Sequence, residues 1–523
     1  MSRLYSAAMH WPWFAIAFAL YPILHIAAAN PGQVDSLALI LAVVTTLVAS
    51  SALLFGLRLL LGNWIRAGLG TTWFVLLFFA YGPLNAWMTG MGGVPDEQLV
   101  TATAWSGGRL QVIHSLLWVL LLVFGWILLR RMRAMPGRLP AALNLVSGLL
   151  LALALFQWLA NADRHGDTAK AQAGAVAIPK NRPDIYFILL DGYARADVLR
   201  QYYGYDNGPF LAGLERRGFQ VAAASESNYN WTFLSLASTL NLDFVQPLMG
   251  DALDPHGNDR DFVYRLLRDN RVASFLRARG YRFIHLQSTW GGTGSNPYAD
   301  EFLPCGGGMF RDDFLLAIWE ASWLRALGSS ATMDLTDCHL RNFETLAALA
   351  REPGPKFVFA HFVPPHHPYL FDRQGNVLRN ANLSNQFEFQ KQLWEDRAAY
   401  VEQLEFVNSR IGVVLDRLIS DSAQTPVVLL QSDHGTNLRR GLKTDEHYRI
   451  RLANLNAVLL PGAPADLMPE NPTAVNLFRI VFDHYFDAGL PFLPDRRFVS
   501  PFQQPFDFTE VDGNGARLEA VAD

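Results

Sequence analysis

Apolar residues are concentrated in the first 160 positions, where they form five uninterrupted stretches. The stretches cover about residues 11–29, 36–57, 69–88, 111–129 and 141–160. Each approaches or exceeds the roughly 20 residues that a helix needs to cross about 30 Å of hydrocarbon. A secretory signal peptide has a single short apolar core. Five stretches in series therefore predict a five-helix transmembrane domain over residues 1–160.

The placement of arginine predicts how these helices are oriented. Residues 1–160 contain eight arginines, no lysine and three acidic residues. Seven arginines precede the first stretch or lie in the turns after the second and fourth stretches: Arg3, Arg58, Arg66, Arg130, Arg131, Arg133 and Arg138. Loops rich in positive charge stay in the cytoplasm. Five crossings then place everything after residue 160 outside the cytoplasm.

The pattern changes after residue 160. Residues 161–182 are small and polar without an apolar period, which predicts a linker. In residues 183–523, helical stretches such as 263–280 and 386–420 alternate with strand candidates at 185–191, 219–225, 281–288, 356–363, 425–433 and 454–462. Apolar strands separated by helices predict an α/β domain with a mostly parallel central sheet.

Composition narrows the class of protein further. Of the 523 residues, 51% are hydrophobic and 17% charged, and the net charge is −4 without a long basic run. Nucleic acid is therefore not an expected partner. The two cysteines, Cys305 and Cys338, exclude a cysteine-based zinc cluster. Outside the cytoplasm they can form one intramolecular disulfide, and the alternative is two separate buried thiols.

Two of the predicted strands end in acidic residues. Asp191 follows one strand, and Asp433 with His434 follows another. A carboxylate directly after a buried strand is costly unless it is paired or bound to a metal, although a single such ending can be a turn or a helix cap. Carboxyl ends of parallel strands share one edge of the sheet, where ligands bind. Two endings, one with an adjacent histidine, favour a divalent-metal site.

A row of hydroxyl side chains follows the second strand and opens a predicted helix. A hydroxyl at a helix N-terminus lies beside free backbone N–H groups that favour an anion, although serine and threonine there commonly serve as caps. Thr232 is placed at this helix mouth. Ser235 and Ser238 lie one and two turns deeper, and Ser227 lies in the entering loop. Thr232 is therefore the predicted nucleophile.

Four motifs in one order carry a family resemblance: LLDGY with Asp191, YNWTFLSLAS with Thr232, HFVPPHHPY over 361–369 and SDHG over 432–435. Together they resemble the alkaline-phosphatase/sulfatase superfamily, and its membrane-anchored branch of lipoteichoic acid synthases and phosphoethanolamine transferases. The resemblance implies an alkaline-phosphatase-like fold and metal ligands Asp191, Asp433 and His434, with Thr232 as both ligand and nucleophile. It implies a leaving-group role for His366 and substrate binding by His447 and His361. For each histidine the alternative is a packed or surface imidazole.

The resemblance also implies an activity and a place. The expected reaction moves a phospho-alcohol group of phosphoglycerol or phosphoethanolamine type. The donor is a membrane phospholipid, the acceptor is an envelope glycan or lipid, and a phospho-threonine is the intermediate. The expected place is the bacterial cytoplasmic (inner) membrane, with a multi-pass anchor and the catalytic domain in the periplasm. The alternatives are a membrane-tethered phosphoric or sulfuric ester hydrolase and a non-catalytic scaffold, and the joint retention of the four site residues counts against the scaffold.

Two departures from the family pattern refine this expectation. Sulfatases mature a Cys or Ser within a Cys/Ser-x-Pro-x-Arg stretch, and no such stretch occurs here, which disfavours sulfate ester hydrolysis. No clear Asp-x-x-x-His pair supplies a second metal site. One divalent metal ion is therefore expected. Zn²⁺ suits the mixed Asp, His and hydroxyl ligands, while Mn²⁺ or Mg²⁺ suits the oxygen ligands.

Overall fold

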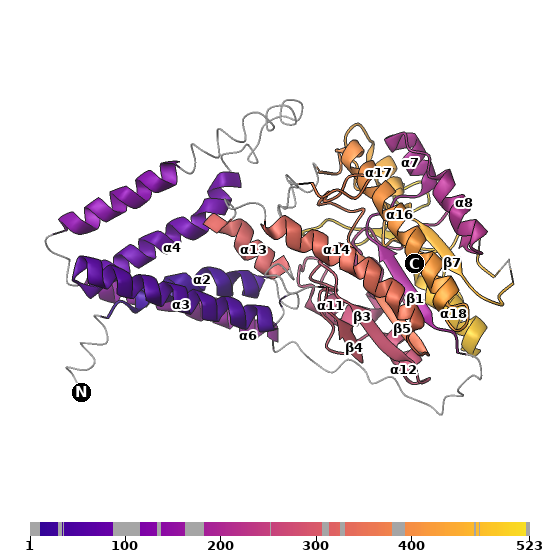
Figure 1. The fold of residues 1–523 in the computed structure, drawn as a ribbon, viewed down its shortest axis with the longest axis horizontal. Helices are drawn as coiled ribbons and strands as arrows, with labels where there is room; N and C mark the ends of the chain where they lie inside the picture. Colours follow the sequence, from indigo (N-terminus) through magenta and orange to yellow (C-terminus); the bar gives the residue numbers. More distant parts are fainter. Residues whose placement is uncertain are drawn as a thin grey trace. The chain divides into compact units, whose positions relative to one another are not determined.

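The computed structural model describes residues 11–518 except 30–33, 35, 87–115, 133–137, 163–181, 251–252, 306–312, 325–329, 379–392, 465–466 and 470. The chain divides into two compact units, whose elements are shown in Figure 1. The first unit joins Met1–Asp167 to Asp312–Gly328, and the second joins Thr168–Arg311 to Ser329–Asp523. The predicted linker, residues 161–182, falls almost entirely outside the described residues.

The first unit consists of apolar helices at the predicted positions. Its described helices before residue 163 are α2 (Trp13–Ala29), α3 (Ser36–Leu61), α4 (Trp64–Ala86), a helical stretch over 116–131, and α6 (Leu139–Ala162). In the described part of the chain, α3, α4 and α6 contain segments long and apolar enough to cross a membrane, whereas α2 offers a shorter apolar helix. The structure thus contains three candidate spans, and five crossings remain a prediction.

Hydrogen bonds join these helices where their polar groups are buried. Asn144 of α6 donates its Nδ2 to the Trp11 carbonyl at 2.9 Å and accepts the Phe14 N–H at 2.8 Å. The indole N–H of Trp118 donates to the Leu77 carbonyl of α4 at 2.7 Å. In hydrocarbon every polar group must find its partner within the protein. Both contacts meet that requirement and fix which helices are neighbours.

The outward faces of the same helices are aliphatic and aromatic. Leu59 is 85% exposed, Phe156 68% and Val48 65%. Contiguous exposed apolar side chains are rare on soluble proteins and mark a surface for lipid or for a partner. This surface is consistent with helices that face lipid.

The second unit is built on a seven-stranded sheet of strand order β2-β7-β6-β1-β5-β3-β4. Strands β1, β3, β4, β5 and β6 run parallel, β7 is antiparallel to β6, and β2 is antiparallel to β7. The predicted α/β class with a mostly parallel sheet is therefore confirmed. The strands are β1 Ile185–Leu190, β2 Gln220–Val221, β3 Arg282–Leu286, β4 Glu301–Leu303, β5 Lys356–Phe362, β6 Val427–Gln431 and β7 Asn456–Leu459, and a separate pair is β8 Arg497–Val499 with β9 Thr509–Val511.

Helices cover both faces of the sheet. Ile185, Phe187 and Leu189 of β1 belong to one core cluster with apolar residues of α9, α11, α12 and α18. On the opposite face, α14 and α16 lie over the sheet (Figure 1), and Phe343 of α14 stacks on Phe362 of β5 at 4.4 Å between ring centroids. The helices of this unit are α7 Ala196–Tyr203, α8 Gly208–Arg216, α9 Thr232–Asn241, α10 Val245–Met249, α11 Asp261–Arg268, α12 Arg271–Arg277, α14 Ser330–Ala348, α16 Arg397–Asp421, α17 Thr444–Leu452 and α18 Leu477–Phe486, with 3₁₀ turns η4 Leu349–Arg351 and η5 Ala474–Asn476.

Several predicted elements have different bounds. The predicted helix 263–280 is two helices, because Asn270 ends one and caps the next: its Oδ1 accepts the Ala273 N–H at 2.8 Å and its Nδ2 donates to the Leu267 carbonyl at 3.0 Å. Of the helix predicted over 386–420, residues 386–392 lie outside the described residues. α16 begins at Arg397, where Asp396 caps it through the Ala399 N–H. The strand predicted over 219–225 is the two-residue edge strand β2.

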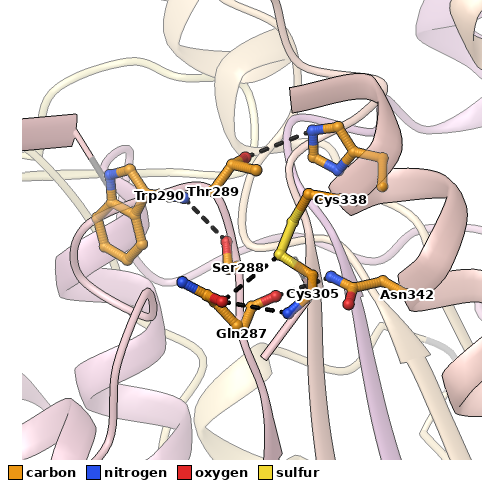
Figure 2. Close-up of a disulfide and its surroundings, with 8 residues drawn as sticks. Gln287, Ser288, Thr289, Trp290, Cys305, Cys338 and Asn342 are labelled. Atoms are coloured by element: carbon orange, nitrogen blue, oxygen red, sulfur yellow. Dashed lines mark hydrogen bonds between the residues drawn. A yellow bond between two sulfur atoms is a disulfide. The ribbon is translucent and has the colours of Figure 1, made fainter. Parts of the chain in front are cut away.

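Cys305 and Cys338 form the predicted disulfide, which joins the end of β4 to α14 (Figure 2). Gln287 lies beside the disulfide. Its side-chain Oε1 accepts a hydrogen bond from the Cys305 N–H at 3.1 Å, and its backbone carbonyl accepts one from Asn342 Nδ2 at 2.7 Å. Both cysteines are buried. The bond therefore closes a segment whose two ends are also held by hydrogen bonds to one residue of the second unit.

Candidate metal centre and active site

The candidate site lies at the ends of three neighbouring strands at the centre of the sheet. β6, β1 and β5 are adjacent and parallel, so their carboxyl ends share one edge. Asp191 follows β1, Asp433 and His434 follow β6, and His361 lies at the end of β5. The topology thus brings residues as far as 243 positions apart in the chain to one place.

The turn after β1 requires a glycine. Gly192 has φ of +64°, and a Cβ there would lie 2.6 Å from the ring of Trp394. Its N–H donates to Asp433 Oδ1 at 3.1 Å, and the next N–H, of Tyr193, donates to the Ser432 hydroxyl at 2.8 Å. The LLDGY motif therefore couples the end of β1 directly to the end of β6.

The turn after β6 has an equally close approach. The Gly435 N–H donates to the Arg451 carbonyl at 2.7 Å. A Cβ on this glycine would lie 2.2 Å from the Ile450 carbonyl oxygen and 2.4 Å from that of Ala453. Backbone atoms cannot yield as a flexible side chain can. The glycine of SDHG thus allows α17 to pack against the turn that carries Asp433 and His434.

Substitution of this glycine should therefore destabilise the second unit. We expect Gly435→Ala to lower the free energy of unfolding by about 1–3 kcal/mol, the usual cost of forcing extra volume into a packed site. Thermal unfolding monitored by circular dichroism measures it. Gly441→Ala is the matched control for the added methyl group, because open space surrounds that position, although its φ of +78° adds backbone strain. Equal or smaller destabilisation by Gly435→Ala would contradict the close-approach argument.

Asp191, Asp433 and His434 converge closely enough to share one ion. One ligand atom from each lies within 4.8 Å of the others, and all three residues are buried. His434 Nδ1 faces the Gly435 carbonyl at 2.9 Å, so the proton sits on Nδ1 and Nε2 carries a lone pair. That Nε2 lies 3.0 Å from Asp433 Oδ2 and 3.7 Å from Asp191 Oδ1. Acceptor atoms therefore face one another across the cluster.

This arrangement fits a cation. Oδ1 of Asp191, Oδ2 of Asp433 and Nε2 of His361 are buried and have no hydrogen-bond partner among the described residues. Unpaired buried acceptors are costly, and a bound metal ion is one of the few things that compensates them. Carboxylate and imidazole together suit Zn²⁺ or another divalent transition metal.

Burial changes the pKa values of the carboxyl groups and the histidines of this cluster in opposite directions. Burial and then the neighbouring Asp191 raise the pKa of Asp433 to about 7, and burial also raises the pKa of Asp191. Burial, followed by the Arg451 guanidinium, lowers the pKa of His434 well below its usual value. Burial lowers the pKa of His361 to about 4. At pH 6 the histidines are therefore neutral, while Asp433 holds a proton in the metal-free protein.

Metal affinity should consequently depend on pH through the carboxyl groups. A metal must displace each proton held in the site. We expect the dissociation constant for Zn²⁺ to rise about tenfold per pH unit below pH 7 for each proton displaced, and to level off above pH 8. Competition with a chelator between pH 5.5 and 8.5 measures it. A constant affinity over this range would mean that Asp433 does not release a proton on binding.

Thr232 is the first residue of α9 and adjoins the ligand cluster. Its Oγ1 lies 3.1 Å from His434 Nε2. Thr232 is partly exposed, whereas every later residue of the helix is buried. Trp231 precedes it in extended conformation and makes no side-chain cap. The hydroxyl is therefore placed at the mouth of the helix, beside backbone N–H groups that favour an anion.

The competing hydroxyls are engaged or buried elsewhere. Ser235 donates its hydroxyl to the Asp433 carbonyl at 2.7 Å, and Ser227 donates to the Tyr229 carbonyl at 2.9 Å. Ser238 is completely buried. Ser235 thus helps hold the turn at Asp433, and Thr232 is the partly exposed hydroxyl of this group.

The predicted histidines occupy different positions. His361 Nε2 lies 3.4 Å from Asp191 Oδ2, and Thr293 Oγ1 lies 2.7 Å from its Nδ1. Nδ1 of His366 lies 2.6 Å from the backbone carbonyl oxygen of His367. The ring centroid of His366 is 6.4 Å from that of His434. His447 lies on α17, where its Nδ1 faces the Leu438 carbonyl at 2.9 Å. His361 is thus placed beside the ligands, His366 nearby, and His447 on the helix that packs behind them.

Arg451, one turn after His447, is a site residue that the sequence analysis missed. Its Nη2 lies 2.9 Å from His434 Nε2, while Nε and Nη1 donate to the carbonyls of Asn230 and Gly435 at 2.8 and 3.1 Å. It is 3% exposed, and burial lowers its pKa to about 10. Two backbone contacts fix the guanidinium and direct its third side towards the cluster. The helical spacing to His447 was the one signal in the sequence.

Comparisons with known proteins give one family match and several similar solved structures. The Sulfatase family profile matches residues 183–485. No curated protein sequence matches the chain. Similar solved structures include the C-terminal periplasmic domain of EptC from Escherichia coli in complex with Zn, which is 11% identical in sequence. The match covers 64% of this chain and 92% of that chain, with a TM-score of 0.41. The C-terminal periplasmic domain of the phosphoethanolamine transferase EptC from Campylobacter jejuni is 10% identical in sequence. The match covers 58% of this chain and 90% of that chain, with a TM-score of 0.36. The phosphonate monoester hydrolase of Agrobacterium radiobacter is 13% identical in sequence. The match covers 61% of this chain and 80% of that chain, with a TM-score of 0.39.

Proposed function

Because the chain belongs to the sulfatase family of the alkaline-phosphatase superfamily, we propose that it is a membrane-anchored transferase of phospho-alcohol groups. The donor is a membrane phospholipid, the group is of phosphoglycerol or phosphoethanolamine type, and the acceptor is an envelope glycan or lipid. The observation that carries this proposal is the partly exposed Thr232 hydroxyl, 3.1 Å from His434 Nε2.

Asp191, Asp433, His434 and Thr232 would hold one divalent ion. Zn²⁺ fits this ligand set best, and Mn²⁺ or Mg²⁺ are the alternatives. When bound, such an ion lowers the pKa of a coordinated hydroxyl and withdraws charge from a phosphate oxygen.

The chain's own residues carry out the transfer in two halves. The Thr232 oxygen forms a bond to phosphorus as the bond to the diglyceride oxygen breaks, which leaves a phospho-threonine. The hydroxyl proton passes to His366, whose pKa burial lowers so that it is neutral beforehand, and then to the diglyceride oxygen. In the second half an acceptor hydroxyl attacks the same phosphorus as the bond to the threonine oxygen breaks, and the acceptor's proton passes through His366 to that oxygen.

Arg451 and the remaining histidines bind the substrate. The guanidinium of Arg451 points at the ligand cluster and would pair with the non-bridging oxygens of the phosphate. His447, one turn earlier on α17, and His361, beside Asp191, would contact the headgroup. The guanidinium is buried and fixed before the reaction begins. Its attraction for the phosphate oxygens therefore grows as negative charge develops on them, without any cost of reorientation.

The membrane unit suits a lipid donor. We propose that residues 1–160 cross the membrane five times with the N-terminus in the cytoplasm, that 161–182 is the linker, and that 183–523 is the catalytic domain outside. The arginine asymmetry supports this orientation in a bacterial cytoplasmic (inner) membrane. The oxidised pair Cys305 and Cys338 supports an external, oxidising compartment for the catalytic domain.

Purified full-length protein in liposomes with headgroup-labelled phosphatidylglycerol or phosphatidylethanolamine tests the proposal. We expect diglyceride release that requires added acceptor glycan or lipid, with the label recovered on the acceptor. Ser238→Ala should behave as the wild type, because that hydroxyl is buried away from the mouth of α9. Equal release without any acceptor, with the label in water, would establish the hydrolase alternative and overturn the transferase.

A further inference from the structure

A short apolar helix from the middle of the second unit's sequence belongs to the first unit. The chain leaves the second unit at Arg311 and returns to it at Ser329. Between these points lies α13 (Asp313–Ala321), with the sequence DFLLAIWEA. Cys305 and Cys338 lie on either side of this segment and are bonded to each other. The excursion is thus a loop that is closed at its base by a disulfide.

The helix packs into the bundle through large apolar side chains. Phe314 is 4% exposed and shares a core cluster with Ile23 and Ala27 of α2 and Ala38 of α3. Just beyond the helix, Trp323 packs with Tyr81 and Trp118, and its ring centroid lies 6.4 Å from that of Tyr81. Figure 1 shows α13 beside α4. These contacts join α13 and the residues that follow it to α2, α3, α4 and the 116–131 helix.

All of these contacts are at one end of the bundle. Ile23 and Ala27 lie late in α2 and Ala38 early in α3. Tyr81 lies late in α4, and Trp118 lies early in the 116–131 stretch. Because α3 and α4 are joined by a two-residue turn, the start of one lies beside the end of the other.

The opposite end carries the arginines. Arg58 lies in the last turn of α3 and Arg66 near the start of α4. The Arg66 guanidinium donates to the Met132 carbonyl at 2.5 Å, so the 116–131 stretch ends there as well. α13 therefore packs at the end of the bundle that charge asymmetry places outside the cytoplasm, the side on which residues after 160 are expected.

We propose that α13 is a second attachment that ties the second unit to the helices of the first unit, with the Cys305–Cys338 bond closing its base. The 19 residues from 163 to 181 could span roughly 60–70 Å when extended, at about 3.3–3.6 Å per residue. This length is the upper limit on the separation that the first attachment allows. The second attachment limits that separation further.

Cleavage of the linker tests the second attachment directly. A site-specific protease sequence is inserted between residues 163 and 181 of the full-length protein, an affinity tag is placed on the N-terminus, and the protein is cleaved in mild detergent. We expect the C-terminal fragment to remain bound to the tagged fragment. In Phe314→Asp protein we expect release, with the fragment still folded and monodisperse. Val413→Asp, at a residue of α16 that is 55% exposed, should leave it bound.

A second variant replaces 313–324 with a Gly/Ser segment of equal length and keeps both cysteines, and it should also release the fragment. Release of the wild-type fragment after cleavage would overturn the proposal. A wild-type fragment that stays on membranes but separates from the tag in detergent would also overturn it, because α13 would then bind lipid rather than the helical unit. The readout is retention, so it is independent of whether the transferase proposal holds.

Discussion

Replacing Thr232 with alanine should lower phospholipid turnover by on the order of 10⁴-fold or more, as loss of a covalent nucleophile does in other enzymes. The hydroxyl adjoins His434 Nε2 and is the accessible one of its group. The substitution removes two heavy atoms at a partly exposed position, so thermal stability should change little. Metal affinity should fall, because Thr232 is one of the four groups proposed to hold the ion, and turnover is therefore compared at saturating metal. Initial rates of diglyceride release, with metal content measured on the same samples, check the prediction.

Two further variants separate the nucleophile from its surroundings. Thr232→Ser keeps the hydroxyl but loses the methyl group that restricts χ1, so partial activity is expected. Ser238→Ala removes a hydroxyl from the same helix where the side chain is completely buried, and activity should be retained. Full turnover by Thr232→Ala, or equal inactivation by Ser238→Ala, would contradict the assigned role.

Replacing Asp433 with asparagine should abolish both metal binding and turnover. Loss of an outer-shell partner alone costs 10–100-fold in metal affinity, so loss of a ligand should exceed about 100-fold. The amide is close in shape to the carboxyl group and can still accept the Gly192 N–H, so the fold should persist. Metal content after dialysis against a limiting concentration of Zn²⁺ measures the effect.

The same variant makes a prediction about the metal-free protein. Burial and the adjacent Asp191 raise the pKa of Asp433 from 3.8 to about 7, so ionising this group disfavours the folded state above pH 7. Asp433→Asn should therefore be at least as stable as the metal-free wild type at pH 8. Asp416→Asn, in the exposed pair with Arg217, is the control that leaves metal binding intact. Full metal content in Asp433→Asn would remove this residue from the site.

The part of the site that lies at the ends of strands could be predicted from the sequence. Asp191 and Asp433 follow apolar runs, and a parallel sheet joins such endings whatever their separation in the chain. The same patterns predicted the central strands because buried parallel strands are apolar throughout. The sequence did not predict that His361 adjoins Asp191. That contact depends on the register in which Leu189 pairs with His361, which an apolar pattern does not encode.

Arg451 and α13 escaped prediction for other reasons. Arg451 lies in a helix rich in charged residues, where an arginine ordinarily faces water; the packing of that helix against Gly435 buries it. The apolar run of α13 is too short for a membrane span and lies far from the other apolar helices in sequence. Its partner surface is created by the folded bundle. Tertiary context decides both cases.

The nucleophile assignment is tested most directly by trapping the covalent intermediate. Full-length protein is incubated with a phospholipid donor without acceptor, quenched in acid and digested, and the peptides are analysed by mass spectrometry. We expect a phospho-alcohol adduct on Thr232 that disappears when acceptor is added and is missing from Asp433→Asn protein. An adduct on Ser227 or Ser235, or turnover without any adduct under the same conditions, would contradict it.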